Sequence, residues 1–577
     1  MRTIIATIFS LLFAIFLLYL WTPDINFQSW GLWWTIFVGT VIIAVWGFIA
    51  ESLSAKIPAV LVLLIMIFLA LGSWSLFRAD SYQELLGEPE VSDFTKDVSP
   101  ISLMEMRIID KDIAHKLGDK TLGEDPALGS VAEVNDFTLQ SVGGKLYFVA
   151  PLEHSGFFRW LNNDYTTGYI KVSATNTNDI SLVQSLNDKP IKIVYQPGGY
   201  FNQDLSRHIW LNGYMTTLTT NTEFEIDDEG NPWWIVTKYE KEVLMGGGDA
   251  TGTLIVNPET GEIKEYSVED TPLWVDRIQP TNFITSQIND WGEFIHGWWN
   301  FSGKDKLRTS EGYNVVYGVD GNCYLYTGIT SVGSDEGTVG FMMVNTRNKK
   351  VFRYNRTGAT ESAAMNSAKS QVQEKGYEAI FPVPYNVNGI PTYFMPLVGN
   401  DGLPKMYSMV SIRNYEIVGV GANLNSTLRA YQRALTSRGN SVGIESGFER
   451  RTVSGKIERI NSDISDGQTN YYILLEDSQM LFRGSSDLSP EVPLSEKGDK
   501  LTLTFDDSNQ TVTQIHTFEN EDIVLIVSEI SEERSEYFEE VDSLKFQKQE
   551  LKNANQVIND LSDEEKLKLL EQVNKKQ

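Results

Sequence analysis

The hydrophobic pattern of the chain begins with three long apolar stretches near its N-terminus. They cover residues 3–21, 30–50 and 57–77, and none of them contains Asp, Glu, Lys or Arg. Each has about 20 residues, which lets a helix cross roughly 30 Å of hydrocarbon. A cleaved signal peptide is the alternative for the first stretch, but no small-x-small site follows it. The pattern therefore predicts three transmembrane helices within residues 1–78.

The few charges that flank these stretches set the expected orientation. Arg2 and Lys56 lie at ends that the positive-inside rule assigns to the cytoplasm, and the first loop holds only Asp24. Arg78, just after the third stretch, argues for the opposite orientation. We expect a multi-pass protein of the cell membrane, in contact with the lipid bilayer, whose large C-terminal region lies outside the cytoplasm.

A two-part pattern then occurs four times. A glycine is followed three or four residues later by an aromatic that opens an apolar strand, and a second strand carries a valine before Asn or Ser. The glycines are Gly144, Gly230, Gly321 and Gly389, and the valines are Val172, Val256, Val344 and Val410. Such recurrence is typical of one supersecondary unit stacked on its neighbours. We predict an array of four related β-hairpin/helix modules of α+β type, two in residues 100–280 and two in 281–445, after an acidic connector at 79–99.

Local signals place helices and turns within this array. Asp110 is a candidate N-cap for a helix that Gly118 is placed to end. Residues 256–266 read as strand, turn and strand, because Pro258 and Gly261 stand where a tight turn needs them. A further helix is predicted over residues 360–374.

The hairpin of the second copy carries a family resemblance. Its sequence, Leu254-Ile255-Val256-Asn257-Pro258-Glu259-Thr260-Gly261-Glu262-Ile263, is similar to the end of PepSY-like domains, and the other copies lack the Thr-Gly pair. The resemblance implies an extracytoplasmic domain that binds, inhibits or regulates and has no catalytic residues of its own.

Residues 451–518 have a different pattern of five short apolar segments separated by turns. Five strands in about 70 residues suit a small barrel of the oligonucleotide/oligosaccharide-binding (OB) kind. Asp487, Glu491 and Asp506 surround these segments, whereas a nucleic-acid-binding sheet needs basic and aromatic groups together. A structural spacer or a protein-binding module is the favoured interpretation.

The last segment, residues 519–577, is acidic and helical in pattern. Apolar residues spaced seven apart give one narrow spine, while the companion positions are mostly polar, so the seam of a coiled coil is poor. The apolar spine of such a helix must pack against the chain's own barrel or against a neighbouring subunit. We therefore expect a homo-oligomer. The spine consists of Ile530, Tyr537, Leu544, Leu551 and Ile558.

Composition limits the chemistry. A formal net charge of -28 makes attraction to nucleic acid improbable. The single cysteine, Cys323, lies in an apolar strand pattern and is expected to be buried. The five histidines have no metal-ligand spacing. Residues 153–156 (Glu-His-Ser-Gly) are candidates for a catalytic group and residues 245–249 (Met-Gly-Gly-Gly-Asp) for a phosphate loop, but each lacks essential partners. We therefore expect no catalytic, metal or cofactor site.

Tryptophan pairs and singlets are the remaining candidates for a binding surface. In an array of modules such residues either line a groove for sugar or peptide, or fill the seams between modules. The candidates are Trp233, Trp234, Trp274, Trp298 and Trp299.

Two functions follow as hypotheses. The favoured one is a membrane-anchored, extracytoplasmic, non-catalytic scaffold that binds, assembles or regulates other proteins of the cell envelope. The alternative is an envelope hydrolase or transferase whose site is split between modules.

Overall fold

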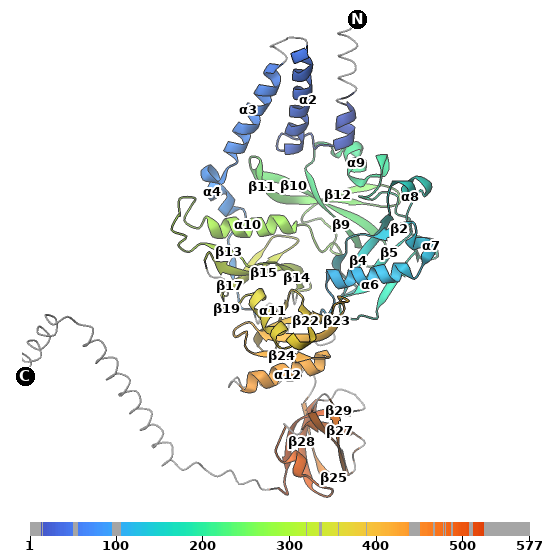
Figure 1. Cartoon of the computed structure of the whole chain (residues 1–577), viewed down its shortest axis with the longest axis vertical. Coiled ribbons are helices and arrows are strands. Elements are labelled where there is room, and N and C mark those ends of the chain that lie inside the picture. Colours follow the sequence, from blue (N-terminus) through green and yellow to red (C-terminus); the bar gives the residue numbers. More distant parts are fainter. Residues whose placement is uncertain are drawn as a thin grey trace, which may run out of the picture. The chain divides into compact units, whose positions relative to one another are not determined.

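The computed structural model describes residues 13, 15–49, 56–94, 106–437 and 450–523, apart from short gaps at 319, 334–336, 356, 388, 466–467, 477, 479, 486–487 and 507–511. The chain divides into two compact units, Met1–Ile444 and Glu445–Gln577 (Figure 1). The predicted apolar spine of the tail lies outside the described residues.

Four antiparallel four-stranded meanders make up most of the first unit. We call them modules 1 to 4 in chain order. Module 1 consists of β3 (Thr138–Val142), β4 (Lys145–His154), β5 (Tyr169–Ser173) and β6 (Ile180–Val183). Module 2 consists of β9 (Thr219–Ile226), β10 (Pro232–Val243), β11 (Gly246–Val256) and β12 (Ile263–Ser267). Module 3 consists of β14 (Asn314–Tyr317), β15 (Cys323–Ser331), β17 (Gly340–Asn345) and β18 (Val351–Tyr354). Module 4 consists of β21 (Val383–Val387), β22 (Ile390–Val398), β23 (Pro404–Ser411) and β24 (Val418–Gly421).

The repeated sequence pattern occupies the two central strands of every module. Its first glycine lies at positive φ in the turn before the second strand, with φ of 87° at Gly230 and 74° at Gly321, where a side chain would be strained. Four residues later comes a buried side chain that lies opposite the valine of the third strand. These cross-strand pairs are Phe148–Val172, Trp234–Val256, Leu325–Val344 and Tyr393–Val410.

One helix precedes each meander and covers the face that carries this buried pair. The helices are α6 (Lys111–Gly123), α9 (Leu205–Ile209), α10 (Thr281–Glu293) and α11 (Glu361–Ser370). Ile113 of α6, for example, belongs to the same buried cluster as Phe148 and Val172. Ile284 of α10 shares a cluster with Leu325 and Val344 in the same way.

The helix expected after Asp110 is present but longer than predicted. The Asp110 carboxylate accepts a hydrogen bond from the Ile113 amide (2.8 Å) and so caps the helix. Gly118, predicted to end it, lies inside it. The glycine leaves room for Phe137, since a Cβ there would be 2.8 Å from that ring. Thr360 caps α11 through the Ala363 amide (3.1 Å).

The modules pack in an order that differs from their order along the chain. The helix-covered face of module 2 packs on the back of module 1, as the shared cluster of Val256 and Val149 shows. The helix-covered face of module 1 packs on the back of module 4, and that of module 4 on the back of module 3. Module 3 returns to module 2 through α10, whose Gln287 donates to the Gly248 carbonyl (2.9 Å). The cyclic order is therefore 2, 1, 4, 3.

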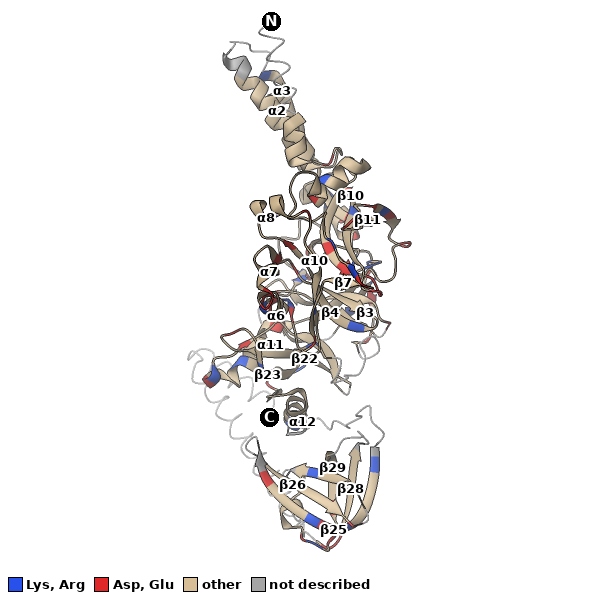
Figure 2. Ribbon diagram, turned by 90° about the vertical axis from the view of Figure 1, so that its right-hand side faces the viewer, with Lys and Arg blue, Asp and Glu red and all other residues tan. Residues whose placement is uncertain are grey.

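The N-terminal helices correct the membrane prediction. Helix α2 (Trp30–Ile49) and helix α3 (Ile57–Gly72) contain no charged residue (Figure 2). Within the described residues, however, no single helix is long and apolar enough to cross a membrane, and only α3 with α4 (Ser75–Glu84), bent by 52°, passes that test as a pair. The prediction of three N-terminal transmembrane helices, and of a multi-pass membrane protein with it, is contradicted.

The break after α3 coincides with hydrogen bonds to Ser73. The Ser73 hydroxyl accepts a hydrogen bond from the Met245 amide (2.9 Å), and the Tyr82 hydroxyl donates to the Ser73 carbonyl (2.7 Å). Trp74 is extended, with φ -72° and ψ 135°, so the helix stops 5 residues before the end of the third apolar stretch. Contacts with module 2 thus outweigh the local helical preference.

The second unit contains five strands around a core of its own. The strands are β25 (Arg450–Ser465), β26 (Gln468–Leu475), β27 (Leu481–Ser485), β28 (Lys500–Asp506) and β29 (Val512–Asn520). They pair in the order β25-β26-β27-β29-β28, and β28 pairs with the first half of the long strand β25. Ile457, Ile473 and Leu503 are fully buried at its centre.

Candidate functional site

A cleft of about 770 Å³ lies where the four modules meet. Its volume is within the range of ordinary ligand pockets. Modules 1 to 3 with their preceding helices, and the segment just ahead of module 4, contribute side chains, and the N-terminal ends of α6 and α10 open into it. The lining residues include Asp110, Lys111, Asp136, Thr138 and Phe148 of module 1, Thr222, Glu223 and Trp234 of module 2, Thr281, Asn282, Asn314 and Val315 of module 3, and Ile380 and Phe381 ahead of module 4.

One wall of the cleft is formed at the start of α6. Lys111 Nζ lies 3.0 Å from Asp136 Oδ2, and His115 Nε2 lies 3.5 Å from Asp136 Oδ1. Partial burial raises the pKa of Asp136, but the hydrogen bonds and charges of Lys111 and His115 together outweigh burial and leave that pKa below its ordinary value. At Asp110 burial dominates and raises the pKa, although the helix amide opposes it. The carboxylates of this wall are therefore engaged in ion pairing and capping.

A buried arginine joins the walls that modules 3 and 4 supply. Arg107 is 7% exposed, donates to the Val315 carbonyl (2.8 Å), and bonds the Asn314 side chain. Its own amide donates to the Tyr385 hydroxyl (2.9 Å). These contacts fix Arg107 in place, so we assign it a structural role beside the cleft.

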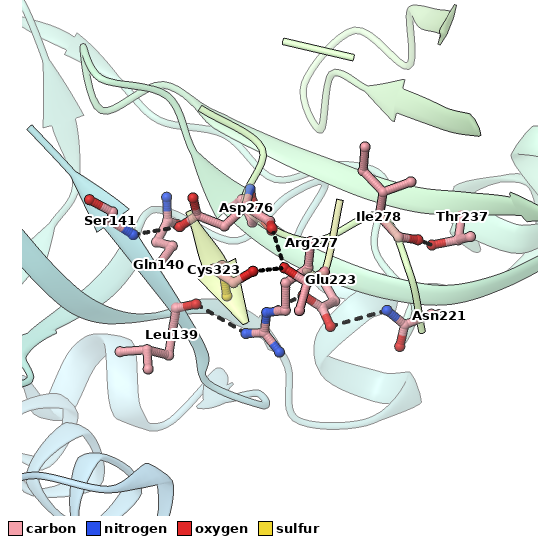
Figure 3. Close-up of polar contacts among 12 residues, drawn as sticks. Leu139, Gln140, Ser141, Asn221, Glu223, Thr237, Asp276, Arg277, Ile278 and Cys323 are labelled. Carbon is pink, nitrogen blue, oxygen red and sulfur yellow. Dashed lines mark hydrogen bonds and ion pairs between the residues drawn. The ribbon is translucent and has the colours of Figure 1, made fainter. Parts of the chain in front are cut away.

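The opposite wall is an ion pair between β9 and the segment that follows module 2. Arg277 Nε lies 3.3 Å from Glu223 Oε2, and Arg277 Nη2 donates to the Leu139 carbonyl (3.1 Å; Figure 3). Burial alone would lower the pKa of Arg277, but the Glu223 carboxylate raises it, so the guanidinium stays charged. Asn221 Nδ2 donates to Glu223 Oε1 (3.1 Å) and completes this wall.

Behind this ion pair lies a second, fully enclosed pair of carboxyl groups. The Asp276 amide donates to Glu225 Oε2 (3.3 Å), while Asp276 Oδ2 accepts from the Ser141 amide (2.6 Å) and the Tyr317 hydroxyl (2.7 Å). Burial, and then the Asp276 charge, raise the pKa of Glu225 well above its ordinary value.

The segment 276–278 therefore joins three modules. The Asp276 carbonyl accepts from Thr346 Oγ1 (2.8 Å) of module 3. The Ile278 carbonyl accepts from Thr237 Oγ1 (2.9 Å) of module 2 (Figure 3). Asp276 also reaches Ser141 of module 1. This arrangement indicates a junction that holds the cleft in shape.

Cys323 lies beside the junction and is 1% exposed, as the apolar pattern predicted. Burial raises the pKa of its thiol to about 12. The thiolate is the reactive form of cysteine, so this residue is inert at neutral pH.

The five candidate tryptophans do not form one surface. Trp234 is 2% exposed in the core between modules 1 and 2, and it reaches the cleft. Trp233 and Trp274 lie together on the other face of module 2, with ring centres 6.3 Å apart. Trp298 and Trp299 contact each other and Phe301 in a separate segment, where Trp299 is 71% exposed.

The other sequence motifs have structural explanations. The imidazole of His154 is buried and its two nitrogens have no partner among the described residues, while Glu153 accepts from the Gly198 amide (3.1 Å). Gly246 and Gly248 are sites of close approach, where a Cβ would meet the side chains of Tyr82 and Phe283. Across the described part of the chain, no group of three His, Cys, Asp or Glu residues could hold a metal ion.

The residues that shape the cleft, chiefly Arg107, Glu223 and Arg277, are not among those that the sequence pattern predicts. One signal was present: Glu223 and Glu225 alternate with apolar residues in a strand, which places two acids on one face of a sheet. Their partner Arg277 comes from a later segment, and nothing local identifies it.

No protein-family model matches the chain, and no curated protein matches it. The resemblance to PepSY-like domains and the OB kind of barrel therefore stay predictions. Among solved structures, a mutant of B. megaterium levansucrase aligns over 72% of this chain and 97% of its own, at 10% identity and a TM-score of 0.17. A TM-score this low carries no argument about fold or activity.

Proposed function

We propose that the chain is a non-catalytic binding scaffold that takes its ligand in the central cleft. The observation that carries this proposal is that modules 1, 2 and 3 and the segment just ahead of module 4 contribute to one cavity of about 770 Å³. A scaffold that positions several modules around one pocket is a common design for binding sites between structural units. The three predicted membrane spans form no part of the proposal.

The alternative, a hydrolase or transferase, has weaker support. The cleft holds the carboxylates of Asp110, Asp136 and Glu223, which could serve an acid–base reaction. Asp110 caps a helix, Asp136 pairs with Lys111, and Glu223 pairs with Arg277. Because each has a structural partner, binding is the better account of their placement.

A cleft-filling variant tests the proposal. Asn282 is exposed in the first turn of α10 and lines the cleft, so Asn282→Trp should block it without disturbing the core. Ser286→Trp is a matched control, because Ser286 is exposed on the same helix and lies outside the cleft. Peptide and glycan libraries would be screened against the purified full chain, and affinities measured by fluorescence anisotropy.

We expect at least one ligand that Asn282→Trp weakens by about tenfold or more, the effect of losing about 1.4 kcal/mol of binding free energy. Ser286→Trp should bind it as the unmodified chain does. Ligands that bind both variants equally would contradict the proposal, and turnover of a ligand would favour the enzyme alternative.

A further inference from the structure

The edge of module 2 that borders the cleft has main-chain groups available for pairing. Strand β9 is the last strand of the order β12-β11-β10-β9, so one of its sides has no neighbouring strand. Thr222, Glu223 and Phe224 of this strand line the cleft. Exposed strand edges are templates for a further extended chain.

The direction of these groups follows from the register. Ile226 lies opposite Pro232, which has no amide hydrogen, and Phe224 and Thr222 lie opposite Trp234 and Val236. In an antiparallel pair, alternate residues point their N–H and C=O groups away from the partner strand. Residues 222, 224 and 226 therefore point theirs outward.

At Ile226 the outward main-chain groups already pair with the amide group of a side chain. Gln140, which is fully buried, donates through Nε2 to the Ile226 carbonyl (2.8 Å) and accepts through Oε1 from the Ile226 amide (2.9 Å). These are the two hydrogen bonds that a peptide group of a neighbouring strand would make. Thr222 and Phe224 have no such partner within the described residues. Thr222 is exposed, and Phe224, although only 2% exposed, lines the cleft.

We propose that the cleft binds an extended polypeptide segment, which pairs as an added strand with Thr222 and Phe224 of β9. This inference rests on the proposed function and names its ligand class. Main-chain pairing supplies affinity in this mode, and pockets for alternate side chains supply specificity. Phe148 and Trp234 offer an apolar floor to side chains on one face of the bound strand.

The test uses the full chain and a phage-displayed octapeptide library. Peptides that bind the unmodified chain and the Ser286→Trp control equally well would be selected. Each would then be resynthesised with single N-methyl groups along its main chain. We expect loss of about tenfold in affinity at alternate positions, because each methyl removes one hydrogen bond to the edge. Uniform tolerance of N-methylation would overturn the inference.

A protein variant provides a second measurement. Thr222→Pro removes an outward N–H while leaving the ladder to β10, since proline is tolerated at sheet edges. We expect it to weaken the selected peptide about tenfold, and Thr222→Val, which keeps the N–H, to bind normally. Equal affinity for both variants would contradict strand addition.

The outcomes separate this inference from the proposed function. If only oligosaccharides bind in a manner sensitive to Asn282→Trp, the polypeptide inference fails and the binding cleft stands. If no ligand of either class is sensitive to Asn282→Trp, both fail.

Discussion

Two glutamates on the same face of β9 are expected to affect stability in opposite directions. Glu223 pairs with Arg277 at 3.3 Å, so its charge is matched. Glu225 is fully buried, and its Oε1 has no hydrogen-bond partner among the described residues. An unmatched buried carboxylate costs stability whenever it is ionised.

The pH dependence of Glu225 follows from the direction of its shift. Its pKa in the folded chain lies well above the ordinary 4.5. The stability that the protonated carboxyl provides is therefore fully present below about pH 4.5 and is lost as the pH rises through the folded-state pKa. Glu225→Gln should raise the free energy of unfolding at pH 8 by about 1–3 kcal/mol, with the gain vanishing near pH 4.5.

Thermal melts of the two variants across this pH range would check the prediction. Glu223→Gln is the control, because it leaves the Arg277 charge without the carboxylate that pairs with it. This variant should lower the free energy of unfolding at pH 8. A Glu225→Gln variant that loses stability at pH 8 would show that the carboxylate is favourable where it lies.

At the scale of elements, glycine decides how closely the outer strands approach. Gly252 of β11 and Gly340 of β17 hold equivalent positions, four residues before the buried valine. A Cβ at Gly252 would collide with the Tyr266 carbonyl of β12, and one at Gly340 with the Tyr354 carbonyl of β18. The glycine is thus required by contact with the last strand of the meander.

We predict that Gly252→Ala separates these strands and costs about 1–3 kcal/mol, as overpacking does. Gly123→Ala is the matched control, because a Cβ there would meet nothing within 4 Å and the glycine ends a helix. Its stability should be unchanged or slightly higher. Urea unfolding would compare the two, and equal midpoints would disprove the steric requirement.

The same elements show what the sequence could and could not predict. The cap at Asp110 was identified because a cap depends on three or four neighbouring residues. The valine positions were identified because each is repeated. Gly118 was misjudged because its contact is Phe137, which a local signal does not include. The third apolar stretch was misjudged in the same way, since Met245 fixes Ser73 at its break.

At the scale of the whole molecule, the two units have separate cores. The core of the second unit contains residues of that unit alone, and every other buried cluster contains residues of the first. Units with separate cores unfold as separate cooperative transitions unless their interface is large. We therefore expect two transitions in calorimetry of the full chain.

A core variant assigns them. Leu503 is fully buried in the second unit, and Leu503→Ala should lower the stability of one transition by about 2–5 kcal/mol while leaving the other in place. The corresponding variant of the first unit is Leu254→Ala, which should do the reverse. If either substitution shifts both transitions, the units are coupled.

The cleft could not be predicted at this scale. Its walls depend on the packing order 2, 1, 4, 3, which brings Arg107 to Asn314 and Arg277 to Leu139. Repeats in the sequence establish that modules exist, but equivalent surfaces on four modules allow many packing orders. Only the particular residues at each interface select one, and these residues are not themselves repeated.

The packing order also has a consequence for how the chain is made. Module 1 leaves the ribosome early, yet its helix-covered face shares a core with Tyr431 and Leu435, roughly 300 residues later. At translation rates of about 5–20 residues per second, that face waits about 15–60 s for its cover. Exposed apolar surface on a nascent chain is what chaperones bind and what drives misassembly. Biogenesis of this protein should therefore depend on a holding chaperone more than its final stability suggests.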